Sequence, residues 1–544
     1  MHAKNPTRIS PRSTESVPVW SRNLPLYVCL ALVIVWAIAD IASSYPDHFF
    51  PRTWDEAIYA HDVVTPQAVF GEYKEGATSY APAKLGYGLA LSAAVSLFGI
   101  NGAMYLSTVC WLLAILLVGS NCARLFGAPA GLYAAAFLSF SPLLGKYLAE
   151  AGPTTLAALG FVLFWIALCR RRAWFTGLTA GLIALVDFKW ALPAALVFVV
   201  NEILNASRQG LLARIKYVIL TGFFSLLPIA AALVVHPTFG SYLSTYVFGH
   251  AALEGFSPSP IFLYYLVRFG AAPAIAVGIV AGILLNSSRK SEGSATKTAA
   301  LRAALVVTLV PPLFYSLFGS LKAVRFLAVT FPLMAVALGF SAALIWRAVE
   351  RPRINAAAAV AARWIVALFL AGSIVVASDG PARHLRLRAG FEPALNHLKE
   401  TTVKDGSVSS YIWPIVLGVW YYPLAVKKPF LLDGLLATDK WVILDPMLDR
   451  VTTDMRAHQA GDTTSASDDG WRAIDQWIHQ ASAPLFKAPS EYYSSDYFLC
   501  ENVMGGIPTL RRWHAWSASL SDSLELLQID PDKARTLRPP VFGP

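Results

Sequence analysis

Apolar segments of membrane length alternate with short polar segments over the first two thirds of the sequence. A helix of about 20 apolar residues crosses the hydrocarbon core of a bilayer, which is about 30 Å thick. Segments 24–43 and 261–285 reach this length, and shorter apolar segments lie between them. We therefore predict eleven spanning helices, near residues 24–43, 84–99, 103–122, 153–169, 174–187, 189–204, 217–235, 261–285, 303–319, 324–346 and 357–377.

The composition also indicates a polytopic α-helical membrane protein. Of the 544 residues, 56% are hydrophobic and only 14% are charged. The mean hydropathy is +0.52. Soluble domains average about 25% charged residues, so this chain lies well outside their usual range.

Basic residues predict the orientation of the helices. The net charge is +10, and Lys and Arg residues gather in five short groups, at 8–22, 170–172, 208–216, 289–302 and 347–353. Lys and Arg are enriched in cytoplasmic loops. We therefore predict a cytoplasmic N-terminus and a C-terminus on the other side. The same placement explains the positive charge without nucleic acid, so we expect membrane lipids and no nucleic acid as partners.

One apolar segment, 128–148, is not counted among the spanning helices. Counting it as a full crossing would invert every helix that follows and would move their basic groups outside. Its Pro142 and flanking glycines favour a broken element. We predict that it is re-entrant or interfacial, an arrangement that places Arg124 on the outer side.

The composition changes after residue 377, where polar and apolar residues become mixed. We predict a helix at 391–401 and strands at 407–412 and 441–444. The expected domains are a cytoplasmic tail at 1–23, a transmembrane domain at 24–377 that contains a first external loop at 44–83, and a small external α/β domain at 378–544.

Two adjacent carboxylates, Asp55 and Glu56, follow the first apolar segment. Carboxylates near hydrocarbon are costly and mark functional sites. If 53–64 is helical, Asp55, Tyr59 and Asp62 share one face, and Glu56 points elsewhere. A simpler interpretation is that the acidic pair only favours the dipole of a helix start.

Glu150 is a second acidic candidate, because the predicted topology places it on the same side as Asp55. Two converging carboxylates are able to bind a divalent cation, or to divide the roles of base and orienting group. Asp55 and Glu150 are therefore the candidate catalytic pair and the candidate metal ligands. The alternative for Glu150 is an ordinary glutamate at a helix start.

Four cations are predicted on this outer side, and they are candidates for phosphate binding: Lys84, Lys189, Lys322 and Arg325. A guanidinium group binds phosphate with two parallel hydrogen bonds, which favours Arg325. Lys189 has an alternative role as the partner of nearby Asp187. Arg325 has an alternative role as an interfacial residue that extends toward water. No P-loop, dinucleotide fingerprint or nucleophile elbow occurs at a credible location, so soluble nucleotide donors are not expected.

In their order along the chain, five segments resemble the integral-membrane glycosyltransferases of the GT-C superfamily. The resemblance is to the bacterial branch that includes protein O-mannosyltransferases and lipid A aminoarabinose transferases, and it covers about residues 20–350. The matching segments are Trp-Asp-Glu-Ala-Ile-Tyr-Ala at 54–60, Tyr-Ala-Pro-Ala-Lys-Leu-Gly at 80–86, Ser-Phe-Ser-Pro at 139–142, the stretch 177–189 and the stretch 322–332.

This resemblance implies a sugar donor carried on polyprenyl phosphate and transfer with inversion at the anomeric carbon. It also implies a bacterial inner membrane, with transfer on the periplasmic face to an envelope lipid, glycan or protein. Asp55 would activate or orient the acceptor, Glu150 would be its acidic partner, and Arg325 would bind the donor phosphate. Glu56, Tyr59, Lys84, Lys189 and Lys322 would contact substrate.

Two features depart from the pattern of this family. Lys84 follows a single proline, whereas relatives commonly have a His-Lys-Pro-Pro-like run. Position 150 is Glu where relatives often have Asp, and the longer side chain changes the geometry available to a metal ion.

Two other classes of function compete with an enzyme. A transporter or lipid flippase would use the same charged residues to bind its substrate or a coupling ion, but transporters place such residues near the membrane midplane. A scaffold would use the C-terminal domain to bind a partner. The predicted clustering at the outer face, beside a large external domain, favours the enzyme over the transporter.

Overall fold

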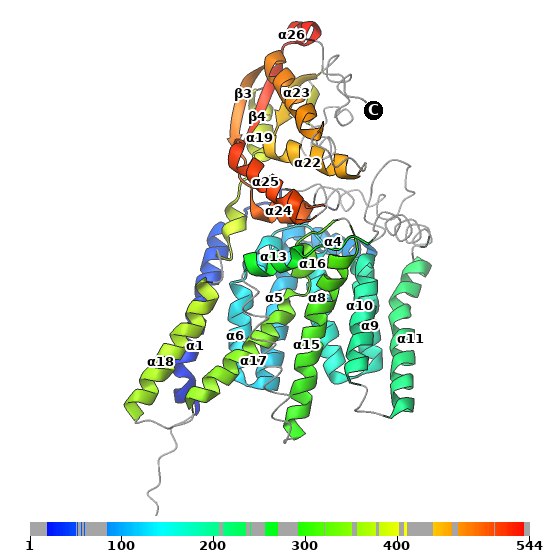
Figure 1. Ribbon diagram of the computed structural model, residues 1–544, viewed down its shortest axis with the longest axis vertical. Helices are drawn as coiled ribbons and strands as arrows, with labels where there is room; N and C mark the ends of the chain where they lie inside the picture. The colour runs from blue at the N-terminus through cyan, green and yellow to red at the C-terminus, as the bar shows by residue number, and fades with distance from the viewer. Residues whose placement is uncertain are drawn as a thin grey trace, which may run out of the picture.

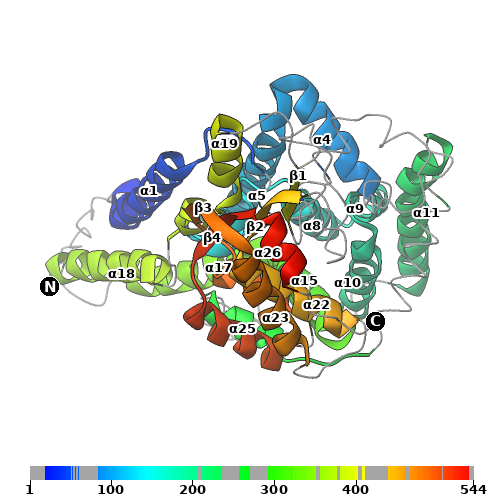
Figure 2. The same cartoon turned by 90° about the horizontal axis from the view of Figure 1, so that it is seen from above.

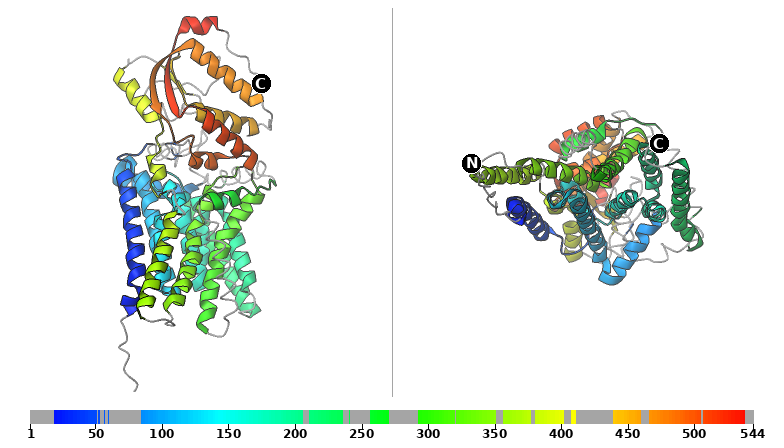
Figure 3. Two further views of the ribbon diagram at one scale, coloured as in Figure 1. Left: turned by 60° about the vertical axis from the view of Figure 1, so that its left-hand side comes forward. Right: turned by 90° about the horizontal axis from the view of Figure 1, so that it is seen from below.

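The computed structural model describes residues 19–50, 52, 56, 59, 84–205, 210–235, 240, 256–269, 292–319, 321–350, 356–376, 380–401, 407–410, 439–459, 466–504 and 506–537. In this part of the chain, a bundle of helices stands beneath a smaller α/β domain (Figure 1). Figure 3 shows the same two layers from another side, with α1 along one edge of the bundle. We call the end of the bundle next to the α/β domain the upper face and the opposite end the lower face.

The helices of the bundle and its upper face are α1 (Val19–Ser44), α4 (Leu85–Phe98), α5 (Gly102–Phe126), α6 (Ala128–Ser139), α7 (Pro142–Tyr147), α8 (Thr154–Arg170), α9 (Ala173–Val186), α10 (Ala191–Leu204), α11 (Leu211–Val235), α13 (Ile261–Arg268), α15 (Glu292–Leu317), α16 (Arg325–Ala328), α17 (Phe331–Glu350) and α18 (Ala356–Val376). The predicted helix at 324–346 is thus divided between α16 and α17. Of the predicted helix at 261–285, only the part up to residue 269 lies within the described residues.

Several of these helices have the length and composition of membrane spans. Among the described residues, six helical segments qualify: Asn23–Ser44, Leu85–Phe126, Leu211–Val235, Thr296–Leu317, Phe331–Val349 and Ala358–Val376. Many of their large apolar side chains are exposed, including Leu116 (65%) and Ile365 (67%). Such exposure suits a lipid environment and not water. The prediction of a polytopic α-helical membrane protein is confirmed.

Helix α4 lies along the upper face instead of crossing the bundle. The residue before it, Lys84, lines a pocket at this face. Asn101, which follows it, accepts a hydrogen bond from the N–H of Phe49 (2.8 Å), just beyond the upper end of α1. Seen from above, α4 shows its full length (Figure 2). The prediction of a spanning helix at 84–99 is therefore wrong, because this helix of 14 residues starts and ends at the same face.

Segment 128–148 crosses the bundle as two helices, α6 and α7. At the lower face, Arg347 near the end of α17 donates a hydrogen bond to the carbonyl oxygen of Phe126. Near the upper face, Thr108 of α5 donates one to the carbonyl oxygen of Leu148 (2.9 Å). The prediction of a re-entrant or interfacial element is wrong. Pro142 stands at the first position of α7, where proline is tolerated, so the break before it does not turn the chain back.

These two errors cancel in the topology. Helix α4 removes one crossing and α6–α7 adds one, so the predicted direction of the described spanning helices from α8 onward is unchanged. Helix α5 runs opposite to its predicted direction. This reversal brings Arg124 to the lower face, close to Cys169 near the end of α8, and not to the upper face, where the prediction placed it.

The C-terminal domain contains a four-stranded sheet in the order β1-β2-β4-β3. Its strands are β1 (Ser407–Ser410), β2 (Asp439–Leu444), β3 (Ser482–Pro489) and β4 (Ser523–Ile529), and its helices are α19 (Phe391–Thr401), α22 (Pro446–Gln459), α23 (Ala466–Ala481), α24 (Asp496–Asn502), α25 (Ile507–Ser519) and α26 (Pro531–Thr536). Strand β1 is parallel to β2, and the other pairings are antiparallel. The predicted α/β domain, with its helix at 391–401 and strands near 407 and 441, is confirmed.

One hydrophobic core continues from the bundle into the C-terminal domain. The same cluster of buried side chains contains Phe161 and Trp165 of α8 together with Tyr497 and Leu499 of α24 and Leu526 of β4. Helices α24 and α25 are the part of the domain nearest the bundle (Figure 1). The domain is therefore packed on the upper face and is not merely joined to it by the chain.

Candidate active site

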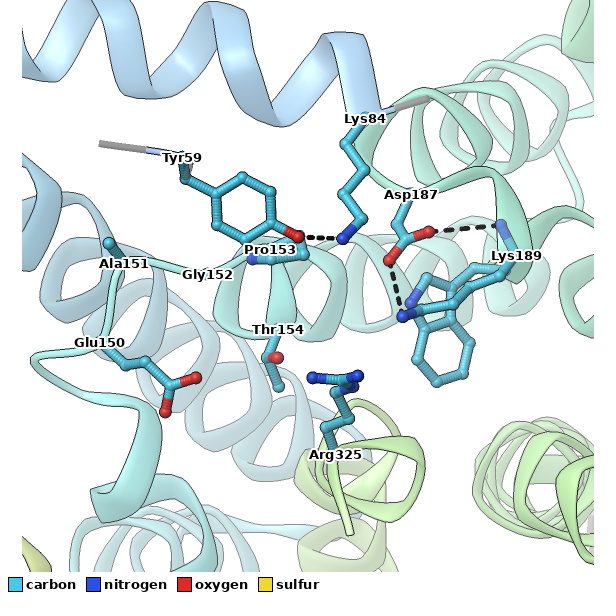
Figure 4. A pocket seen from close by; sticks show the side chains of 11 residues that line it. Tyr59, Lys84, Glu150, Ala151, Gly152, Pro153, Thr154, Asp187, Lys189 and Arg325 are labelled. Carbon is cyan, nitrogen blue, oxygen red and sulfur yellow. Dashed lines mark hydrogen bonds and ion pairs between the residues drawn. The ribbon is translucent and has the colours of Figure 1, made fainter. Parts of the chain in front are cut away.

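A pocket opens at the upper face, beneath the C-terminal domain. It encloses about 360 Å³, part of which is open to solvent. The lining side chains come from loops and helix ends: Tyr59, Lys84, Glu150, Ala151, Gly152, Pro153, Thr154, Asp187, Lys189, Trp190 and Arg325. Figure 4 shows Lys84, Lys189 and Arg325 approaching this space from three separate elements. The fold thus brings three of the four predicted phosphate-binding cations into one pocket.

Lys189 stands in the turn between α9 and α10, and Asp187 holds it there. Its Nζ lies 3.0 Å from Oδ2 of Asp187, and its N–H donates to Oδ1 of the same carboxylate (3.4 Å). Asp187 is fully buried, whereas the Lys189 side chain is 20% exposed. The pairing of Lys189 with Asp187 is confirmed. Its side chain also lines the pocket, and its binding of phosphate stays a prediction.

Trp190 forms a rigid part of the same wall. Its ring is almost fully buried and makes edge contacts with Phe161, Tyr315 and Phe326. The hydroxyl of Tyr315 donates to the carbonyl oxygen of Lys189 (2.8 Å). These contacts fix the backbone of the turn, so the Lys189 side chain extends into the pocket from a well-packed backbone.

Lys84 and Tyr59 form a second wall. The Lys84 ammonium donates a hydrogen bond to the Tyr59 hydroxyl and lies 4.6 Å from the centre of the Tyr59 ring. Both side chains are buried. The hydrogen bond and the 4.6 Å distance place the ammonium beyond the hydroxyl end of the ring and not over its face, so the hydroxyl oxygen is its partner. Tyr59 and Lys84, predicted from sequence as substrate contacts, are thus adjacent in the pocket.

Glu150 lies in the loop between α7 and α8. Ser107 of α5 donates a hydrogen bond to its carbonyl oxygen (2.6 Å), and the Nζ of Lys146 lies 3.9 Å from its Oε2. Burial raises the pKa of Glu150, the charge of Lys146 lowers it, and the charge of Glu501 raises it again. A carboxylate with a raised pKa accepts a proton more readily near neutral pH.

Glu56 is buried near this site, although it does not line the pocket. Its Oε2 accepts the N–H of Arg52 (3.0 Å). Burial, and then the charge of Glu150, raise its pKa from 4.5 to about 8. Its neighbours Asp55 and Asp62 lie outside the described residues, so the expected common face of Asp55, Tyr59 and Asp62 stays a prediction.

Arg325 and Lys322 have different surroundings, although they are three residues apart. Arg325 begins α16 and lines the pocket. Lys322 is fully buried outside it, where its ammonium donates hydrogen bonds to the carbonyl oxygens of Tyr315 (2.9 Å) and Phe318 (3.3 Å). A cation at the last carbonyls of a helix stabilises the end of that helix. Lys322 therefore caps α15.

Sequence reasoning missed two charged residues that border the site, Lys146 and Glu501. The Lys146 Nζ lies 3.2 Å from Oε2 of Glu501, and Nη1 of Arg325 lies 2.9 Å from Oε1 of Glu501. Glu501 belongs to the C-terminal domain. The available signal was a single carboxylate in a mostly apolar stretch, Tyr497 to Met504.

The arrangement suits an anionic group and a proton acceptor side by side. Lys84, Lys189 and Arg325 supply positive charge to a partly desolvated pocket, where charge-assisted hydrogen bonds are strong. Glu150 adds a carboxylate whose raised pKa suits it to accept a proton. Within the described residues, no group of three His, Cys, Asp or Glu side chains lies close enough to hold a metal ion.

No protein-family model and no curated protein matches the sequence. Solved structures do match the fold. ArnT from Cupriavidus metallidurans in the apo state aligns over 81% of this chain and 95% of its own, with a TM-score of 0.52 and 14% identity. The chain has the GT-C fold. The fold predicted from the sequence resemblance is thereby confirmed.

A second protein with the GT-C fold gives a similar match. The archaeal oligosaccharyltransferase AglB from Archaeoglobus fulgidus, in complex with an inhibitory peptide and a dolichol-phosphate, aligns over 86% of this chain and 73% of its own, with a TM-score of 0.53 and 11% identity. Another ArnT structure is bound to undecaprenyl phosphate and aligns over 80% of this chain and 95% of its own (TM-score 0.50, 14% identity). At these identities the similarity shows a shared fold, and it does not show a shared reaction.

Proposed function

We propose that this protein is a glycosyltransferase that moves a sugar from a polyprenyl-phosphate donor to an acceptor in the cell envelope. The observation that carries the proposal is the pocket in which Lys84, Lys189 and Arg325 meet beside Glu150. A donor phosphate needs cations at the membrane surface, and its lipid tail needs apolar helix surfaces below them. The ArnT structure bound to undecaprenyl phosphate supports a donor of this class.

The proposed reaction is a single displacement with inversion. A carboxylate takes the proton of an acceptor hydroxyl, and the oxygen attacks the anomeric carbon as the bond from that carbon to the phosphate oxygen breaks. The departing polyprenyl phosphate takes the bonding electrons, and the pocket cations stabilise its charge. We assign the base to Asp55, with Glu150 as its acidic partner. Glu56, Tyr59, Lys84 and Lys189 are proposed to contact or support the substrates, and the capping role of Lys322 is indirect.

Asp55 and Glu150 are the expected ligands of a divalent metal ion. Within the described residues, the Glu150 carboxylate lies 3.9 Å from the Nζ of Lys146 and belongs to no group of three His, Cys, Asp or Glu side chains, and Asp55 lies outside these residues. A metal-binding role for Asp55 and Glu150 therefore stays a prediction.

We further propose that the pocket and the C-terminal domain, residues 378–544, face the periplasm of a bacterial inner membrane. The support is the charge at the lower face. Arg171 pairs with Glu202 there (2.9 Å), Arg214 donates to the carbonyl oxygen of Glu202 (3.2 Å), and Arg347 lies beside the end of α5. Positive residues mark the cytoplasmic side, so the tail at 1–23 would be cytoplasmic and the transmembrane domain would extend over 24–377.

A direct test is mass spectrometry of envelope glycolipids and glycoproteins from cells with the wild-type gene, without it, and with the Arg325→Ala variant. A glycan that is present with the wild type, lost without the gene and reduced with Arg325→Ala is the expected result. It would identify the sugar and show whether the acceptor is a lipid, a glycan or a protein. Identical glycans in all three strains, with normal levels of the variant in the membrane, would exclude the proposed transfer.

A further inference from the structure

The C-terminal domain is bonded to the segment that carries Arg325. The N–H of Lys322 donates to the carbonyl oxygen of Val503 (2.9 Å), and the N–H of Val324 donates to that of Cys500 (2.9 Å). Leu321 and Met504 form an antiparallel bridge. The backbone immediately before α16 is therefore held by residues 500–504, which follow it by about 180 positions in the sequence.

Tyr265 of α13 joins these two segments from a third side. Its hydroxyl lies 2.6 Å from the carbonyl oxygen of Lys322 and 3.1 Å from that of Cys500. The Tyr265 side chain is fully buried. This buried hydroxyl lies between the carbonyl groups of two different segments and fixes the distance between them. The backbone position of Arg325 therefore depends on both the bundle and the C-terminal domain.

Glu501 adds a side-chain contact to Arg325 itself. Its Oε1 lies 2.9 Å from Nη1 of Arg325, and its Oε2 lies 3.2 Å from Nζ of Lys146. The hydroxyl of Tyr147 donates a hydrogen bond to Oε2 (2.8 Å). The Glu501 side chain is only 6% exposed. A buried carboxylate is costly unless it is paired, and this one is paired with two cations and a hydroxyl group.

The position of Glu501 indicates that it supports Arg325 and does not compete with a bound phosphate for it. Arg325 lines the pocket, and Glu501 does not. The carboxylate therefore reaches the guanidinium from outside the space in which a phosphate would lie. A group placed this way restricts the rotamers of the arginine, and it reduces the ordering cost when the arginine binds an anion.

We infer that Glu501 is a positioning residue of the transferase site, by which the C-terminal domain orients Arg325 toward the donor phosphate. The inference rests on the proposed function and extends it. The pocket of the membrane bundle is then incomplete without the C-terminal domain, and donor affinity depends on a carboxylate that never touches the donor.

The test measures binding of fluorescent undecaprenyl phosphate to the purified full-length protein in detergent. The variants are Glu501→Gln, Arg325→Ala and the double variant. Glu491→Gln is the matched control, because Glu491 is an exposed carboxylate of the same domain. The dissociation constant refers to the folded fraction, so partial loss of folded protein does not change it. A merely structural role of Glu501 would lower that fraction and leave the dissociation constant unchanged.

Glu501→Gln is expected to weaken binding about tenfold, the size of one lost charge-assisted contact. Arg325→Ala should weaken it at least as much, and adding Glu501→Gln to Arg325→Ala should cost less than about twofold, because the first residue acts through the second. Glu491→Gln should bind like the wild type. Thermal unfolding without ligand should show the same non-additivity between Glu501 and Arg325.

Three results would contradict the inference while leaving the proposed function standing. If the wild type binds undecaprenyl phosphate and Glu501→Gln binds it with the same affinity, Glu501 has no positioning role. Tighter binding by Glu501→Gln would show that Glu501 competes with the phosphate for Arg325. Fully additive losses in the double variant would show that the two residues act separately. A wild type that binds undecaprenyl phosphate no better than undecaprenol would instead contradict the proposed function, and with it the inference.

Discussion

Asp187 and Lys189 form an ion pair with 3.0 Å between Oδ2 and Nζ, and the two residues are unequally exposed: Asp187 is fully buried, and the Lys189 side chain is 20% exposed. The cation that lines the pocket is therefore also the counter-ion of a buried carboxylate. Binding and stability are linked at this position, and substitutions must be chosen to separate them.

Lys189→Ala is expected to lower the free energy of unfolding by roughly 3–5 kcal/mol, because it leaves the buried Asp187 carboxylate without its partner. The double variant Asp187→Asn, Lys189→Ala should recover part of this loss. Thermal unfolding in detergent measures both effects, and binding of undecaprenyl phosphate should be weakened in both variants. A double variant less stable than Lys189→Ala would argue against the pair.

Asp55→Asn should abolish sugar transfer and leave expression and detergent stability at the wild-type level, because the change removes a proton acceptor and keeps the size of the side chain. Transfer is measured with purified protein and a polyprenyl-phosphate sugar. Asp47→Asn is the control, since Asp47 is an exposed carboxylate in the segment that follows α1. Near-normal transfer by Asp55→Asn would remove Asp55 from the mechanism.

Arg325→Ala should raise the Michaelis constant for the donor by about 10- to 100-fold, the range expected for a lost charged hydrogen bond. The Michaelis constant for the acceptor should change little, because the proposed phosphate contact belongs to the donor. Steady-state kinetics with each substrate varied in turn separates the two. Equal changes for both substrates would count against a donor-specific contact.

Lys322→Met is expected to behave differently from Arg325→Ala. It removes the ammonium that caps the last carbonyls of α15 and should therefore lower the thermal unfolding temperature. The folded fraction should keep its affinity for undecaprenyl phosphate, since Lys322 lies outside the pocket. Loss of affinity without loss of stability would show that Lys322 contacts the donor after all.

Glu56 predicts a dependence of stability on pH. Its pKa is about 8 in the folded protein and 4.5 in its ordinary state. Between these values the folded protein holds a proton that the unfolded chain has released, so the fold loses stability as the pH rises from about 4.5 to about 8. Glu56→Gln stays uncharged, so its unfolding temperature should fall less over this range and exceed that of the wild type above pH 8. Parallel curves for the two proteins would disprove the raised pKa.

The sequence was sufficient to predict the fold class, because helix length and hydropathy are local properties of the chain. It misassigned two neighbouring segments. Segment 84–99 is apolar enough for a span, but packing at the upper face holds α4 there, and segment 128–148 contains a break that the crossing tolerates. The packing of α4 against α5 cannot be predicted from the hydropathy of segment 84–99. The continuation of the chain past Pro142 cannot be predicted from the hydropathy of segment 128–148.

From the sequence, candidate site residues could be predicted only where a charged or aromatic residue lies near the end of a predicted membrane span. Tyr59, Lys84, Glu150, Lys189 and Arg325 were found in this way and do line one pocket. Lys322 shares that pattern, but its side chain turns toward the end of α15. Glu501 is distant in sequence from the pocket residues, and its place depends on how the C-terminal domain packs, which no local pattern specifies.

The hydrophobic core that runs from α8 of the bundle into β4 of the C-terminal domain has a consequence for how this protein is handled. Tyr497 and Leu499, which belong to that core, are buried and would be bared if the C-terminal domain were expressed alone. A soluble fragment of that kind should aggregate. Heating the intact protein should unfold the bundle and the adjoining α24–β4 part of the C-terminal domain in one transition, because both contribute side chains to the same core.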